Sequence, residues 1–129
     1  MALGGVQRQL VTLLDSARAE GSATVIVSCG ASLIELSFDG GRVTAETGRD
    51  ASRVGDGLLS VEDEALLLVL GWRRDDDRSP FGREWHPNTY SHDIAADVVR
   101  TARHAYLCET EDLRVLLRVG EPEGAASLT

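Results

Sequence analysis

The stretch TVIVSCGASLIELSFDGGRVTAET, residues 24–47, contains three short segments in which apolar and polar side chains alternate. The segments are residues 24–29, 32–38 and 42–47, and a period of two is typical of β-strands that are buried on one side. Glycines stand at both junctions, where a tight hairpin needs a positive φ. The stretch therefore predicts an antiparallel meander with one buried face and one mostly polar face.

Helical periodicity flanks this meander on both sides. Apolar residues recur with helical spacing in residues 6–20 and 91–107. Residues 61–70 predict a further helix, because Ser60 is a typical helix cap and acidic residues occupy the first turn after it. Gly21 and Gly71 follow residues 6–20 and 61–70, in the position where glycine commonly ends a helix. The second half of the middle segment is apolar nearly all round, so we expect that helix to be buried on more than one side.

The remaining segments complete the expected order of elements. Residues 48–57 predict a loop, and residues 72–88 predict a hairpin with short strands near Trp72 and Trp85. A last strand is expected at residues 113–119, and the tail from residue 120 is expected to be frayed. The order α-β-β-β-α-β-β-α-β predicts a single α+β domain over residues 1–129, ordered from about residue 5 to residue 119. Its antiparallel sheet would carry the helices on one face.

Composition restricts the classes of function. The chain has 129 residues, a hydrophobic content of 43% and a net charge of −8, and all of its basic residues are arginines, a bias typical of GC-rich genomes. The acidic balance disfavours nucleic acid and anionic membranes as partners, because phosphate binding needs a basic surface. Neither a signal-peptide pattern nor an apolar run of membrane length is visible, so we expect a cytoplasmic protein.

Residues capable of catalysis or metal binding are few and poorly spaced. His86, His92 and His104 lack the helical or CxxC-like spacing that is typical of zinc sites. Cys29 and Cys108 are too few for a disulfide framework, and each is expected to be a small buried hydrophobic residue. A nucleophilic role for Cys29 beside His86 or His92 would need proximity in the fold. We expect no catalytic residue, no metal and no cofactor.

Two pairs of residues are candidates for binding a protein partner. Ile26 and Leu33 lie on the polar face of the predicted meander, where they would form part of a dimer or partner patch or would contact a further helix. Trp72 and Trp85 belong to a residue type that is enriched at interaction hot spots, and the alternative is that both are part of the core.

A resemblance to a known family rests on the run LSVEDEALLLVLGW (residues 59–72), the later Trp85, and the helix AADVVRTARHAY (residues 95–106) that leads to Leu113. These features resemble the actinobacterial type III secretion chaperone-like domains, related to the YbjN and TY-Chap group. The resemblance extends over about residues 6–119 and consists of packing positions: Gly71, Trp72, Trp85, Ala95, Ala96 and Tyr106. It implies a non-enzymatic, often dimeric, protein-binding domain, sometimes associated with secretion or regulation.

The leading functional hypothesis is therefore a chaperone-like or adaptor domain that binds an unknown protein partner, needs no cofactor and forms a homodimer. One alternative is an acidic immunity-type inhibitor of a basic toxin, which the net charge of −8 permits. Another is a small enzyme or small-molecule-binding domain that uses His86, His92 or Cys29.

Overall fold

The computed structural model describes residues 4–30, 32–49, 61–74 and 80–119. Most of the loop expected at residues 48–57 and the whole tail from residue 120 lie outside this described part. The two loop residues inside it, Gly48 and Arg49, belong to the end of the third strand.

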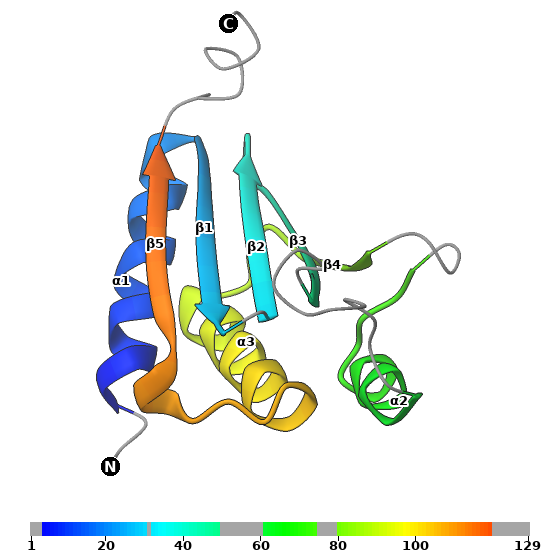
Figure 1. Ribbon diagram of the computed structural model, residues 1–129. Helices are drawn as coiled ribbons and strands as arrows, with labels where there is room; N and C mark the ends of the chain where they lie inside the picture. Colours follow the sequence, from blue (N-terminus) through cyan, green and yellow to red (C-terminus); the bar gives the residue numbers. More distant parts are fainter. Residues whose placement is uncertain (1–3, 31, 50–60, 75–79, 120–129) are drawn as a thin grey trace, which may run out of the picture.

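Five antiparallel strands form one sheet in the order β4-β3-β2-β1-β5 (Figure 1). The meander is present as predicted, and its strands pair along their whole lengths. The last strand of the chain pairs with the first, so the sheet joins the two ends of the sequence. The strands are β1 (Ser22–Cys29), β2 (Ser32–Asp39), β3 (Arg42–Arg49), β4 (Phe81–Trp85) and β5 (Arg114–Val119).

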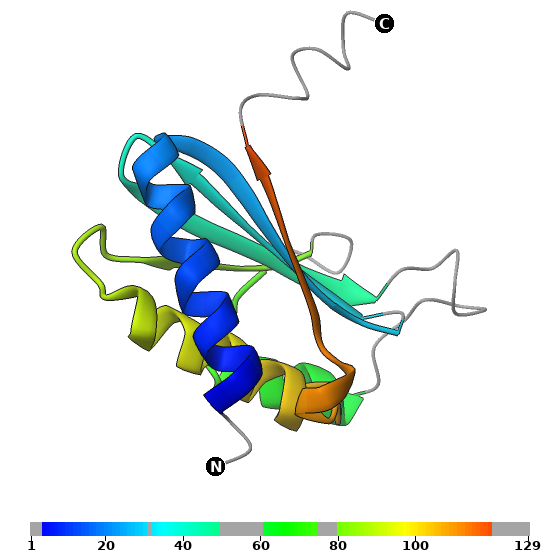
Figure 2. The same ribbon diagram turned by 90° about the vertical axis from the view of Figure 1, so that its left-hand side faces the viewer.

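The helices lie on one face of this sheet and leave the other face open (Figure 2). They are α1 (Gly4–Glu20), α2 (Val61–Val69) and α3 (Ser91–Ala105), and a short 3-10 helix, η1 (Thr110–Asp112), precedes β5. Gly21 ends α1 with a φ of 82°, as its position predicts. The α+β fold class is confirmed, and the elements follow the expected order except that one strand, β4, lies between α2 and α3 where two were expected.

The core lies between the sheet and the helices. In β1, β2 and β3 every second residue is buried, because successive side chains of a strand point to opposite faces. These residues pack against the apolar stripes of α1 and α3, which the helical spacing predicts. Fully buried members include Leu10, Leu14, Val25, Leu36, Val43, Leu67, Trp72, Ile94 and Val98.

The segment that contains the two tryptophans forms less regular structure than a two-stranded hairpin. Trp72 is outside a strand, and the short strand expected there is reduced to a single bridge between Arg73 and Gly82. Trp72 and Trp85 are 0% and 5% exposed, and their rings meet edge to face with centroids 6.3 Å apart. Of the two roles considered for the tryptophans, the structure therefore shows the core role, and a surface role for them is wrong.

Polar partners hold both tryptophans at fixed positions over α3. The indole Nε1 of Trp72 donates to Thr101 Oγ1 at 2.9 Å, and that of Trp85 donates to Asp97 Oδ2 at 2.9 Å. Arg83 Nη2 donates to the same Asp97 oxygen at 3.0 Å. Each buried indole N–H thus has the acceptor that it needs.

The expectation that the second helix is buried on more than one side is wrong. Leu67 of α2 is fully buried, whereas Leu66, Leu68 and Val69 are 38%, 46% and 81% exposed. The helix packs against α3 and lies at the periphery, beyond the sheet (Figure 1). Because one neighbour covers one stripe, the apolar residues on its other sides stay at the surface.

Cys29 and Cys108 form a disulfide, which corrects the interpretation of them as two separate buried residues. They are 79 residues apart in sequence, and their Cα atoms are 6.4 Å apart. Cys29 ends β1, and Cys108 follows α3 at the same end of the sheet. Only the packing of α3 on the sheet brings the two together, so no local sequence pattern could reveal the pairing.

Candidate interaction surface

The open face of the sheet contains a small apolar group at the β5 side. Ile26 of β1 lies directly opposite Leu116 of β5. Leu33 of β2 lies opposite Ser28 and is therefore a diagonal neighbour of Ile26. Leu33 and Leu116 are 38% and 56% exposed, and Ile26 is half-buried.

The two sequence candidates Ile26 and Leu33 thus lie on the expected face and near each other, and no described helix covers them (Figure 2). Leu116 is the most exposed member of the group, and sequence reasoning missed it. Its strand was predicted, but its position beside Ile26 depends on the pairing of the first strand with the last.

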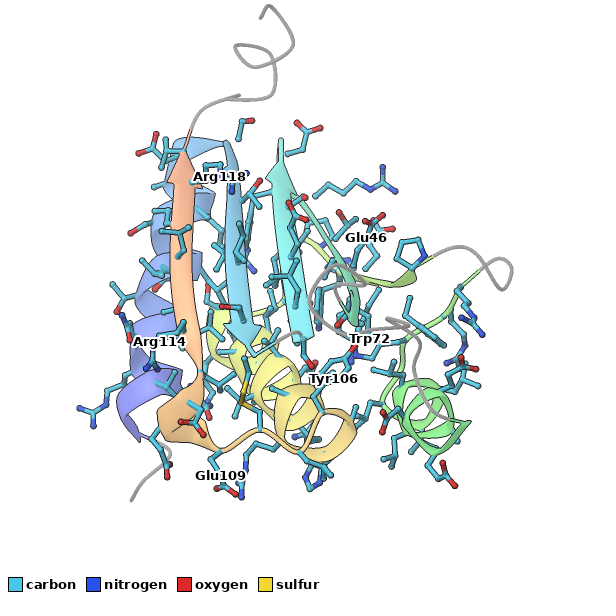
Figure 3. All side chains as sticks on the ribbon, in the orientation of Figure 1. Glu46, Trp72, Tyr106, Glu109, Arg114 and Arg118 are labelled. Carbon is cyan, nitrogen blue, oxygen red and sulfur yellow. A yellow bond between two sulfur atoms is a disulfide. The ribbon has the colours of Figure 1, made fainter. Side chains whose placement is uncertain are left out.

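Two arginines flank Leu116 on the same face. The pairing places Arg114 opposite Ser28 and Arg118 opposite Thr24, so both side chains project from the open face together with Leu116. Figure 3 shows them spaced along β5. Both are exposed, and within the described part of the chain neither forms an ion pair with a carboxylate. Arg114 Nη1 instead donates to the backbone oxygens of Glu111 and Leu113, each at 3.1 Å.

The acidic side chains of this face lie on the other strands. Glu35 is on β2, and Glu46, labelled in Figure 3, is on β3 directly opposite it. Glu84 on β4 accepts from Arg42 Nε at 3.0 Å, and this hydrogen bond, with the attraction of the two charges, holds the Glu84 pKa below its usual value. The open face therefore has a basic border along β5 and an acidic region towards β4.

No strand in the described part of the chain pairs with the outer edge of β5. β5 is the last strand of the sheet, and β1 occupies one side of it only. Every second residue of an edge strand directs its N–H and C=O away from the sheet, where they can pair with another extended chain. In Figure 2, which looks onto the β5 side, α1 lies on the covered face beside β5 and leaves the outer edge in view.

The residues considered for catalysis or metal binding do not form a site of either kind among the described residues. His86, His92 and His104 are all exposed, and His86 Nδ1 accepts from the backbone N–H of Asn88 at 3.0 Å. Cys29 is in the disulfide, so it cannot act as a thiolate towards either histidine in this form. No group of three or more potential metal ligands occurs among the residues that the structure describes.

None of the helices in the described ranges is long and apolar enough to cross a membrane. A comparison of the chain with protein-family models, with curated proteins and with solved structures finds no match. The evidence for the candidate surface therefore comes from the sequence and structure of this chain alone.

Proposed function

We propose that this chain is a non-enzymatic protein-binding domain, chaperone-like or adaptor in kind, that holds an extended segment of a partner against the outer edge of β5. The observation that supports the proposal is a strand edge with which no described strand pairs, together with the side chains of Arg114, Leu116 and Arg118 beside it. Backbone pairing would supply affinity, and the three side chains would supply selectivity.

The chemistry of the edge specifies its partner. A strand added to β5 would place every second side chain beside Arg114, Leu116 and Arg118. Acidic residues would pair with the two arginines, and an apolar residue would contact Leu116. The required pattern is acidic-x-apolar-x-acidic, and because it reads the same in both directions, a parallel or an antiparallel partner strand satisfies it. Screening over about 8 Å at physiological ionic strength makes these local charges outweigh the net charge of −8.

A second copy of β5 is a poor occupant of the same edge. Two-fold pairing centred on Leu116 would put Arg114 opposite Arg118 twice, and like charges directly opposite each other are destabilising. Pairing centred on Val115 or Leu117 would put an arginine opposite Leu116. The homodimer that we also propose would therefore use another surface. Light scattering should then give twice the chain mass of 13.9 kDa, and a strictly monomeric result would refute the dimer.

We also propose a cytoplasmic location and a protein partner in place of nucleic acid or membrane. The net charge of −8 supports a protein partner over nucleic acid or an anionic membrane, because phosphate binding needs a basic surface.

The binding mode can be tested with two synthetic peptides of equal composition. Ac-TEVIVET-amide carries its acidic residues four apart around a central isoleucine, and Ac-TVEIEVT-amide carries them two apart. Titration of the ¹⁵N-labelled chain should shift the amide signals of β5 and give an affinity at least about fivefold higher for the first peptide. Equal affinities, or shifts confined to other elements, would refute the β5 edge as the site.

Charge reversal provides the matched control within the protein. Arg118→Glu should lower the affinity for the first peptide at least about fivefold, because it replaces an attraction by a repulsion. Arg103→Glu changes an exposed arginine on α3, away from the strand edge, and should leave the affinity unchanged. An equal loss in both variants would mean that net charge alone controls binding.

A further inference from the structure

The two cysteines of the Cys29–Cys108 disulfide differ in exposure. Cys29 is partly exposed, whereas Cys108 is 5% exposed. Cys29 also borders an open surface depression that is lined by Ser28, Cys29, Gly30, Asp112 and Arg114. A thiolate that enters this depression would meet Cys29 first, and one cation, Arg114, and one carboxylate, Asp112, lie beside its approach.

The disulfide also closes a backbone segment with an unusual conformation. The N–H of Cys108 donates to the carbonyl oxygen of Ala102 at 3.0 Å and thereby closes the C-terminus of α3. The preceding residue, Leu107, has a φ of 55° and is 80% exposed. Side-chain-bearing residues seldom adopt this left-handed conformation, and glycine is the usual residue at that position of a helix end. The covalent bond to Cys29 therefore holds a segment with an intrinsic tendency to open.

We propose that Cys29–Cys108 is a thiol–disulfide exchange site for a dithiol reductant. A thiolate of the reductant attacks Cys29 Sγ, forms a mixed disulfide with it, and displaces Cys108 as a thiolate that takes up a proton. The second thiol of the reductant, as a thiolate, then attacks the reductant sulfur that is bonded to Cys29. This step releases Cys29 as a thiolate, which takes up a proton. Two electrons and two protons pass from the dithiol to the two cysteines, and the reductant leaves as a disulfide.

Reduction would loosen the connection to β5 and leave the sheet intact. Cys29–Cys108 is the covalent link between the end of β1 and the segment that continues through η1 into β5. On either side of Cys108, the Tyr106 hydroxyl stays hydrogen-bonded to Thr47 Oγ1 at 2.8 Å, and Leu113 stays buried. The segment between these two anchors, residues 107–112, is the part that gains freedom. This inference is independent of the proposed function, although greater freedom of residues 107–112 would loosen the segment that leads into β5.

Reduction kinetics distinguish an exchange site from a purely structural cross-link. Dithiothreitol is added to the oxidised chain at a series of urea concentrations below the unfolding transition, and free thiols are counted with time. We expect a rate that does not depend on urea, because attack through the depression beside Cys29 needs no unfolding. A rate that rises with urea along the slope of global unfolding would overturn the proposal.

Hydrogen exchange on the reduced wild-type chain tests whether residues 107–112 gain freedom when the disulfide is reduced. The amides of Cys108 and Asp112, which donate to Ala102 and Glu109, should exchange at least about tenfold faster after reduction. Amides in the centre of β1 and β2 should keep their protection. Unchanged exchange at Cys108 and Asp112, or a loss of protection throughout the sheet, would contradict a local switch.

Arg114 provides a residue-level test of the direction of attack. With the anionic thiol 2-mercaptoethanesulfonate as the probe, Arg114→Glu should slow the formation of the mixed disulfide about threefold or more. Arg103→Glu is the control and should leave the rate unchanged. Equal rates in wild type and Arg114→Glu would show that the thiolate does not approach through this depression.

Discussion

Replacing Cys29 and Cys108 together by serine removes a cross-link between residues that are 79 positions apart. The entropy of closing a loop of 79 residues in the unfolded chain corresponds to about 4.5 kcal/mol at 25 °C, and cross-links of this kind typically contribute about 2–4 kcal/mol. We therefore expect the double variant to lose about 3 kcal/mol of unfolding free energy. For a chain of 129 residues this corresponds to a melting temperature lowered by roughly 10 °C.

Urea unfolding followed by circular dichroism gives the free energy directly. The wild-type chain in excess dithiothreitol should match the double variant, and the double variant should not respond to dithiothreitol. The single variant Cys29→Ser is the control for lost packing, because it leaves one thiol and no cross-link. A difference below about 1 kcal/mol between wild type and double variant would refute the reasoning, because the cross-link would then stabilise the fold far less than loop-closure entropy predicts.

Three further predictions concern the packing around Trp72 and the surface pair on β3 and β4. Thr101→Val keeps the shape of a fully buried side chain but removes the acceptor of the Trp72 indole N–H, so urea unfolding should show a loss of about 1–3 kcal/mol. Gly71→Ala should lower the free energy of unfolding by more than about 1 kcal/mol in the same assay, because residue 71 has a φ of 102° and its new Cβ would meet Arg83 Nη1 at 3.1 Å. An NMR titration should find the Glu84 pKa below its ordinary value of 4.5, and Arg42→Gln should raise it. Because the folded pKa is the lower one, any stabilisation by this exposed pair is present above the unfolded pKa and lost as the pH falls.

The meander could be predicted from sequence because its information is local. Alternation decides which side chains are buried, and the glycines at 40 and 41, with φ of 59° and 94°, decide where the hairpin turns. Ser37, for example, pairs with Thr44, and the two residues are close in sequence on either side of this turn. The helical stripes of α1 and α3 are local in the same way, since each is a repeat within one segment.

The parts that sequence reasoning missed depend on distant segments. Leu116 becomes part of the open-face patch only because β5 returns to pair with β1, and the partnership of Cys29 with Cys108 depends on where α3 ends over the sheet. Trp72 and Trp85 were identified as a pair, but no spacing rule connects them to the acceptors on α3 that bond their buried N–H groups. The exposed side of α2 reflects an absence of covering neighbours among the described elements, which hydrophobicity alone does not reveal.

The pairing of β1 with β5 has a consequence for the chain while it is being synthesised. Val25 and Ile26 of β1 receive their β2 partners within the next dozen or so residues, but their β5 partners are added about 90 residues later, roughly 5–20 s at typical elongation rates. Throughout that interval β1 is itself an edge strand with β-branched side chains and unpaired backbone groups. A nascent chain that stalls after α3 would therefore expose the β1 edge that Arg114–Val119 covers in the complete fold.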